Sequence, residues 1–360
     1  MKTTKALLLK TFMFVVVLLI AGSISAYASG AQEVIDIIRE AEQSNAPGST
    51  PAPSGGGPTT WKAVSNSRFG TSDIMGIAYG TAGSAGGRWV AVGENGKIAY
   101  SPDGVTWTAV SNSRFGADDY IRAIAYGTAG SAGGRFVAVG DEGKMAYSAD
   151  GVTWTAVRNS TFDADSRTYG IAYGSNKFVA VGSGIAYSSD GITWTRVSNS
   201  SFDDGLILDI AYGGNRFVAV GEGGIIAYST DGSSWTATAN SSFDADLTGA
   251  AIAYGNASSR FVAGGSGGEM AYSADGARWT AAANSPSGWN SVGAIGYGNN
   301  RFVAGSVFYS KMAYSTDGSS WTAIADSPFS GEFSAINAIA YSNGRFVAGG
   351  TGGKIAYADW

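Results

Sequence analysis

A tryptophan recurs along the chain at nearly constant intervals, and this repeat constrains the fold more than any other feature of the sequence. The intervals run from 40 to 47 residues, and most of these tryptophans precede a short apolar or small-residue run. A period of this length, with several strand signals in each unit, is typical of the blades of a β-propeller. The repeated tryptophans are Trp61, Trp107, Trp154, Trp194, Trp235, Trp279 and Trp321.

Within one unit the sequence predicts four short β-strands. In the fourth unit they are Ile207–Gly213, Arg216–Gly221, Ile225–Ser229 and Trp235–Thr238. Ile, Val, Phe and Tyr alternate with small alanines, a composition that suits a sheet covered on both faces by neighbouring blades. Glycine-containing turns interrupt every run too early for a helix.

Counting the strands predicts an all-β fold, a seven-bladed β-propeller of four-stranded blades that spans residues 61–360. The seventh copy of the unit stops at Trp360, before its fourth strand. Trp61–Val64 reads as a fourth strand without a blade. We expect it to pair with Lys354–Ala358 and close the ring, because no sheet edge is then left open. The first strands begin near Ile74, Ile121, Thr168, Ile207, Ala250, Val292 and Ile336.

Each junction between third and fourth strands carries the motif S-x-D-G-x-x-W, in six in-register copies. Asp and Ser side chains accept hydrogen bonds from turn amides, glycine permits the reversal, and tryptophan is an apolar anchor. A residue present in every repeat serves the repeat, so a structural role is predicted rather than metal binding or catalysis. The aspartates are Asp103, Asp150, Asp190, Asp231, Asp275 and Asp317.

This motif resembles the Asp-box, or BNR repeat, of sialidase-type propellers, and the resemblance covers the whole domain. It implies that these turns lie on the face away from the ligand site. The sialidase catalytic set, an arginine triad with a Tyr–Glu pair, has no assignable counterpart, and sialidases have six blades. Xyloglucanases and photosystem-assembly propellers share the repeat. Six arginines occupy one strand position in different blades and are expected at blade edges: Arg88, Arg135, Arg216, Arg260, Arg301 and Arg345.

The composition excludes several kinds of site. The chain has no cysteine and no histidine, which removes disulfides, thiolate or imidazole catalysis and Cys/His zinc sites. Neither a cofactor nor a metal is expected. A net charge of −5 lacks the basic excess of nucleic-acid-binding proteins.

The segment before the propeller reads as a leader and a tether. Lysines precede an apolar run at residues 12–21 and a small-residue cleavage pattern, which predicts a signal peptide over residues 1–28. The run is short for a membrane anchor, which needs about 20 residues. Residues 29–60 are predicted to hold a short amphipathic helix, at 32–43, and a Pro/Gly/Ser linker. The mature protein is therefore expected to be secreted or periplasmic, with no membrane span.

Candidate site residues are those at which the repeats differ. Three aromatics in the sixth blade, Trp289, Phe308 and Tyr309, are a candidate stacking platform, and Arg122 and Tyr169 are candidates for the channel lining. The phenylalanines of the interblade connections are expected to plug blade junctions. Acidic residues in the same connections predict an acidic face on blades 1 to 5: Asp118, Asp119, Asp163, Asp165, Asp203, Asp204, Asp209, Asp244 and Asp246.

These features favour a non-enzymatic extracytoplasmic binding protein, a monomer whose ligand is a glycan or a protein. Two alternatives remain. The acidic loops are also compatible with a carboxylate-pair glycoside hydrolase acting on polysaccharide. A scaffold whose helix docks a partner is the other.

Overall fold

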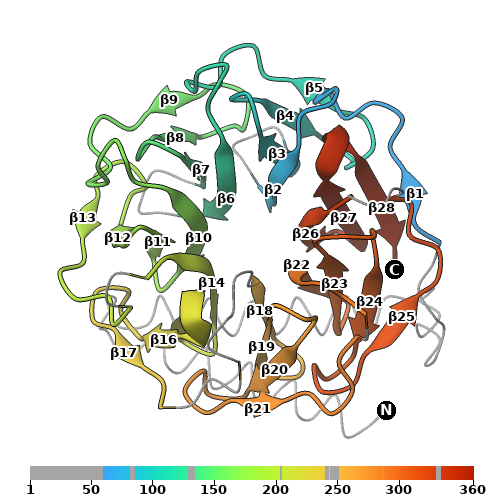
Figure 1. Cartoon of the computed structure of the whole chain (residues 1–360). Coiled ribbons are helices and arrows are strands. Elements are labelled where there is room, and N and C mark those ends of the chain that lie inside the picture. The colour runs from blue at the N-terminus through green and yellow to red at the C-terminus, as the bar shows by residue number, and fades with distance from the viewer. Residues whose placement is uncertain are drawn as a thin grey trace, which may run out of the picture. The chain divides into compact units, whose positions relative to one another are not determined.

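Seven four-stranded antiparallel sheets are arranged in a ring around a central channel (Figure 1). The computed structural model describes residues 60–81, 86–128, 134–202, 205–239, 243, 251–286, 288–329 and 334–360. All of them belong to one compact unit, Pro58–Trp360. The predicted signal peptide, helix and linker lie outside the described residues. The seven sheets confirm the seven-bladed all-β fold that the sequence predicts.

In each blade the chain runs from the channel outward through strands one to four. The first strands are β2 (Ile74–Gly80), β6 (Ile121–Gly127), β10 (Thr168–Gly174), β14 (Ile207–Gly213), β18 (Ala251–Gly255), β22 (Val292–Gly298) and β26 (Ile336–Ser342). The second strands are β3 (Arg88–Gly93), β7 (Arg135–Gly140), β11 (Lys177–Gly182), β15 (Arg216–Gly221), β19 (Arg260–Gly264), β23 (Arg301–Ser306) and β27 (Arg345–Gly350).

The outer half of each blade holds shorter strands. The third strands are β4 (Ile98–Ser101), β8 (Met145–Ser148), β12 (Ile185–Ser188), β16 (Ile226–Ser229), β20 (Met270–Ser273), β24 (Met312–Ser315) and β28 (Ile355–Asp359). The fourth strands are β5 (Thr108–Ala109), β9 (Thr155–Ala156), β13 (Thr195–Arg196), β17 (Thr236–Ala237), β21 (Thr280–Ala281), β25 (Thr322–Ile324) and β1 (Lys62–Ala63). Two 3-10 helices, η3 (Glu222–Gly224) and η4 (Thr351–Gly353), lie in second-to-third turns.

The ring is closed as the sequence predicts. β1 pairs with β28, so the seventh sheet has the order β1-β28-β27-β26, and these strands lie side by side in Figure 1. The ladder continues past β1, where the Val64 N–H donates to the Ile355 carbonyl at 2.8 Å. Trp61 is 4% exposed and packs in the cluster formed by blades 6 and 7. The seventh blade therefore has four strands like the other six, and β28 is paired on both sides.

The hydrophobic core is divided among seven clusters, and each lies mainly between two adjacent blades. Second strands such as β3 are buried along almost their whole length, because other strands cover both faces. Most connection phenylalanines are buried at these junctions, as predicted; Phe69 and Phe202 are examples. Each blade is thus stabilised by its two neighbours.

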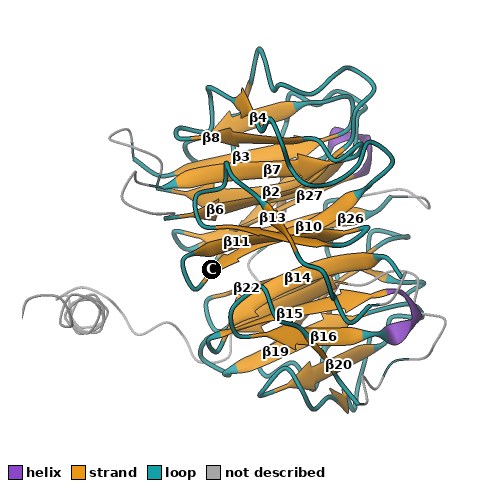
Figure 2. Ribbon diagram, turned by 90° about the vertical axis from the view of Figure 1, so that its left-hand side faces the viewer, coloured by secondary structure: helices purple, strands orange, loops and turns teal. Residues whose placement is uncertain are grey.

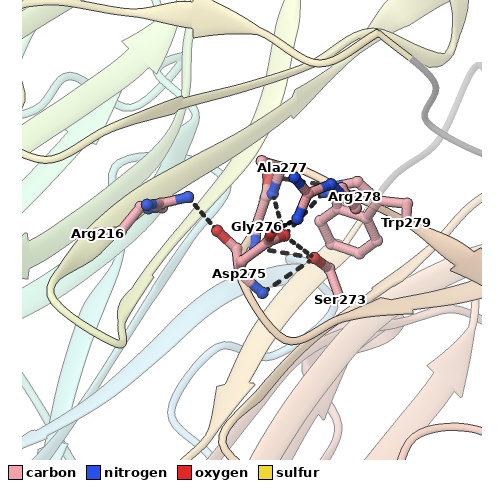
Figure 3. Close-up of polar contacts among 7 residues, drawn as sticks. All are labelled: Arg216, Ser273, Asp275, Gly276, Ala277, Arg278 and Trp279. Carbon is pink, nitrogen blue, oxygen red and sulfur yellow. Dashed lines mark hydrogen bonds and ion pairs between the residues drawn. The ribbon is translucent and has the colours of Figure 1, made fainter.

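The repeated S-x-D-G-x-x-W turns have the local role that the sequence predicts. Figure 3 shows the turn of blade 5, in which Asp275 Oδ1 accepts the N–H groups of Ala277 and Arg278 at 2.9 and 2.8 Å. Ser273 accepts the Gly276 N–H at 2.8 Å. Gly276 has φ +69°, and a Cβ there would lie 2.5 Å from Val218 of blade 4, so only glycine fits.

A cation from the preceding blade caps this turn. Arg216, at the start of β15, donates to the Asp275 carbonyl (Figure 3) and also stacks on Tyr228. The arginines at this strand position therefore join adjacent blades and do not converge, which agrees with the sequence prediction of blade-edge residues. We name this contact, a cation of one blade bonded to the aspartate carbonyl of the next, the interblade clasp. The other clasps are Arg88 to Asp150, Arg135 to Asp190, Lys177 to Asp231, Arg260 to Asp317 and Arg345 to Asp103.

Candidate binding site at the channel mouth

The antiparallel order of the strands sorts the loops onto two faces. The interblade connections and the second-to-third turns lie on one face, which we name the connection face. The S-x-D-G-x-x-W turns and the first-to-second turns lie on the other, the turn face. In Figure 2 the two 3-10 helices mark the connection face. The candidate residues of the loops are therefore separated from the repeated turns.

The channel opens on the connection face as a cavity of about 370 Å³. Its lining includes the second residue of the first strand in six blades, and this residue differs in type from blade to blade. The members of the ring are Met75, Arg122, Tyr169, Leu208, Gly293 and Asn337. Arg122 and Tyr169 therefore lie in the channel lining, where the sequence placed them.

Five side chains of blades 2 and 3 form the rim cluster: Tyr120, Arg122, Asp141, Arg167 and Tyr169. Arg122 donates through both Nε and Nη2 to the two carboxylate oxygens of Asp141, the second contact at 2.9 Å. Its guanidinium stacks on the rings of Tyr120 and Tyr169, at 5.3 and 4.9 Å from their centroids. Such stacked, forked contacts hold the guanidinium in one orientation.

Arg167 adds a second cation to the rim cluster. It precedes β10, forms an isolated backbone β-bridge with Asp141, and is exposed to solvent. A hydrogen bond with Tyr169 raises the pKa of Arg167 further above its already high ordinary value. Because Asp141 balances only one of the two arginines, the rim cluster carries a net positive charge within a surface that the sequence predicts to be acidic.

Asp209 lies deeper in the same cavity, on β14. Its Oδ1 accepts the Ile210 N–H at 2.8 Å, and its Oδ2 accepts the Ile252 N–H of blade 5 at 2.9 Å. Burial raises the pKa of Asp209 to about 6, although these two hydrogen bonds act to lower it. The sequence grouped Asp209 with the loop acids, whereas the structure places it in the channel wall.

The remaining predicted acids are dispersed. Asp118, Asp163 and Asp165 are exposed on the connection face. Asp119 is buried and accepts from Lys144 at 2.8 Å; burial would raise its pKa, but the bonds from Lys144 and Gly116 outweigh that effect and lower it. Asp203, Asp204, Asp244 and Asp246 lie outside the described residues. Within the part of the chain that the structure describes, no group of three acids is placed to hold a metal ion.

The aromatic platform predicted in the sixth blade is not formed as three exposed rings. Trp289 is 6% exposed and belongs to the core cluster of blades 5 and 6, which corrects its assignment to an exposed surface. Phe308 and Tyr309 are 38% and 48% exposed. Tyr309 borders a second cavity of about 540 Å³, where the Lys311 ammonium lies 5.7 Å from its ring centroid.

Comparison with known proteins places the chain by fold alone. The sequence matches no family model and no curated protein. Similar solved structures include YCF48 bound to D1 peptide, with a TM-score of 0.63, 16% identity, and coverage of 87% of this chain and 100% of that chain.

YCF48 from Cyanidioschyzon merolae also has a TM-score of 0.63 and 16% identity, covering 83% of this chain and 99% of that one. A catalytically inactive virginiamycin B lyase from Staphylococcus aureus with quinupristin has a TM-score of 0.64 and 14% identity, with the same coverages, 83% and 99%. The fold thus occurs in a peptide complex and in an enzyme, so only the site can indicate function. None of the described helices is long and apolar enough to cross a membrane.

Proposed function

We propose that this chain is a non-enzymatic, extracytoplasmic binding protein that holds a segment of a protein partner over the channel mouth. The rim cluster carries this proposal. The S-x-D-G-x-x-W turns and the clasps recur around the ring and maintain it, whereas the stacked Arg122 between Tyr120 and Tyr169 occurs once. A preorganised guanidinium between the exposed ring of Tyr120 and the half-buried ring of Tyr169 suits peptide carbonyl and carboxylate groups.

Two further observations support a peptide ligand. YCF48, a propeller of similar fold, has been solved bound to a peptide. Asp141 already neutralises Arg122, so the pair is set in place before a ligand arrives and little ordering is lost on binding.

The same proposal covers the class of the repeat and the cellular location of the protein. We assign the S-x-D-G-x-x-W turns to the Asp-box class, supported by six in-register copies with a common Ser–Asp–amide hydrogen-bond pattern. Secretion or export to the periplasm is supported by the leader pattern of residues 1–28.

Capture of partners from an extracytoplasmic protein fraction tests the proposal. Three proteins are compared: the wild type, the double variant Arg122→Ala with Tyr169→Ala, and the variant Arg278→Ala on the turn face. We expect one retained partner whose binding is at least about tenfold weaker only in the double variant, since Tyr and Arg side chains are enriched among the few residues that dominate binding energies. Equal binding of the partner by all three proteins would refute the proposal. Hydrolysis of a polysaccharide from a test panel, abolished by Asp→Asn substitutions in the loops, would also refute it.

A glycan is the second candidate ligand, because the exposed Tyr309 lines the 540 Å³ cavity together with Trp289, and the ring of its neighbour Phe308 is also exposed. Exposed rings of this kind stack on the apolar faces of sugars. A glycan array comparing the wild type with Tyr309→Ala distinguishes this candidate: a bound glycan lost in the variant supports it, and an empty array removes it.

A further inference from the structure

Asp209 is an exception in the repeat. It is the third residue of its first strand, and every other described blade has glycine or alanine there. The corresponding residues are Gly76, Ala123, Gly170, Ala251, Ala294 and Ala338. A single carboxylate thus occupies a ring position that the other blades fill with the smallest side chains.

The neighbours explain why the position is small. A Cβ on Gly76 would lie 3.0 Å from Val92 and 3.3 Å from the Ile124 nitrogen of the next blade. This space lies between two adjacent first strands. Asp209 fits in the corresponding space because its carboxylate accepts the Ile252 N–H across the gap. It therefore bridges β14 and β18 while remaining part of the cavity wall.

The charge of Asp209 lacks a counter-ion among the described residues, whose ion pairs do not include it. Each oxygen accepts one backbone N–H, and a carboxylate has about four acceptor sites. Capacity for a further donor therefore remains. The other charged residue in the cavity lining, Arg122, is already paired with Asp141.

Aliphatic residues contribute to the lining of the same cavity, beside the polar Tyr169 and Asn337. Leu208, Ile171 and Ile252 line the same cavity, with Met75 and Val307 also in its wall. A cavity that combines these aliphatic residues with one unpaired carboxylate is complementary to an aliphatic chain that ends in a cation. A volume of about 370 Å³ accommodates a lysine or arginine side chain.

We propose that the central cavity receives a basic side chain of the protein partner and that Asp209 is its counter-ion. This inference rests on the proposed function and names the chemistry that the partner must present. The aliphatic stem contacts Leu208 and its apolar neighbours, the cation contacts the carboxylate, and the rim cluster contacts the flanking backbone. Recognition then requires a lysine or arginine at the tip of the bound segment.

Titration with Nα-acetyl-lysine methylamide tests the contact without the partner. Its neutral counterpart, Nα-acetyl-norleucine methylamide, measures the contribution of the charge. The protein variants are Asp209→Ala and Asp209→Asn, with Asp118→Asn as a control acid on the same face. Asp209→Ala installs the residue that blade 2 already has, so the fold is expected to be retained, and thermal melting verifies this.

We expect the lysine probe to bind the wild type and the Asp118→Asn control alike, and at least about tenfold more weakly to both Asp209 variants. Binding to the wild type should also weaken below about pH 6, where Asp209 becomes protonated; Arg122 and Tyr169 are the other titratable residues in the lining. Equal binding by Asp209→Ala, equal binding of the norleucine probe, or no binding of the lysine probe would overturn the inference.

The partner provides an independent arm. If Asp209→Ala captures the partner as well as the wild type does, the basic side chain is not required, and the inference fails while the proposed function stands. If the rim variant captures the partner normally, the proposed function fails instead, whatever the probe titration gives.

Discussion

The pKa values of aspartates in this molecule are shifted in opposite directions, and the extent of burial decides the direction. Asp103 and Asp209 both accept two backbone N–H bonds. At Asp103 burial opposes the shift, but the turn amides outweigh it and lower the pKa to about 2. At Asp209, inside the channel wall, desolvation is larger than the same kind of hydrogen bond and raises the pKa to about 6.

Removing a turn aspartate should destabilise one blade locally. Asp150 accepts the N–H groups of Val152 and Thr153 at 2.8 and 2.7 Å, so Asp150→Ala leaves both donors without their acceptor. We expect a loss of about 1–2 kcal/mol in the free energy of unfolding, measured by denaturant titration. Asp118→Ala, at an exposed acid outside the turns, is the control and should change it by less than about 0.5 kcal/mol. Equal effects would contradict the structural role.

The two kinds of aspartate predict opposite pH dependence. A lowered pKa means that the turn aspartates stabilise the fold above pH 4 and lose this contribution as the pH falls toward 2. For Asp209 the folded pKa lies above the unfolded value of 3.8, so its contribution is present below about pH 4 and is lost as the pH rises through 6. Stability of the wild type relative to Asp209→Ala should therefore increase on acidification from pH 7 to 4, by at most about 3 kcal/mol. A constant difference across this range would show that the carboxyl is not desolvated.

At the scale of the element, the interblade clasp explains why the arginine recurs. Arg216 and Arg278 both contact Asp275, but Arg216 comes from blade 4 and reaches its carbonyl, whereas Arg278 lies in the same turn with its side chain 92% exposed (Figure 3). The contact of Arg216 joins two blades, whereas the contact of Arg278 is an ion pair on the surface.

The two arginines therefore form a matched test. Arg216→Ala should lower the free energy of unfolding by about 1–3 kcal/mol, because a partly buried, charge-assisted hydrogen bond and a stacked ring contact are lost. Arg278→Ala should leave it within about 0.5 kcal/mol, since exposed ion pairs contribute little. Chemical denaturation of the two variants distinguishes the roles, and similar losses would mean that the clasp does not join the blades.

Closure of the ring depends on β1, and the fourth prediction concerns this strand. A chain that begins at residue 67 lacks Trp61, the β1 ladder and the Val64 bond, and it should melt well below a chain that begins at residue 60 or aggregate through the exposed edge of β28. Burial of one large aromatic alone contributes about 2–3 kcal/mol, against a net stability of about 5–15 kcal/mol. Equal melting temperatures would show that β1 is not needed for closure.

At the scale of the whole molecule, the sequence predicts the ring better than the site. Each blade is specified by its own repeat, so period, strand order and the unpaired strand at Trp61–Val64 were sufficient for the fold. The site depends on contacts between blades. Arg122 of blade 2 stacks on Tyr169 of blade 3, and nothing in their spacing along the chain shows that the two side chains meet.

Two candidate assignments show what repeat comparison misses. Trp289 was read as an exposed ring because it departs from the phenylalanine pattern, but it packs into the junction of blades 5 and 6 as the phenylalanines do in theirs. Asp209 was read as one more loop acid. Alignment at the third position of the first strand, where the other described blades have only glycine or alanine, is the signal that would have separated it.

Because β1 completes the blade that contains β28, the first strand to leave the ribosome waits longest for its partner. Roughly 300 residues are translated between them, which takes about 15–60 s at ordinary elongation rates. During that time the nascent chain is an incomplete ring, because β1 lacks its partner strand β28. A chain that stops before Ile355 lacks the partner of β1, so the ring can close only after the last blade of the propeller has been made.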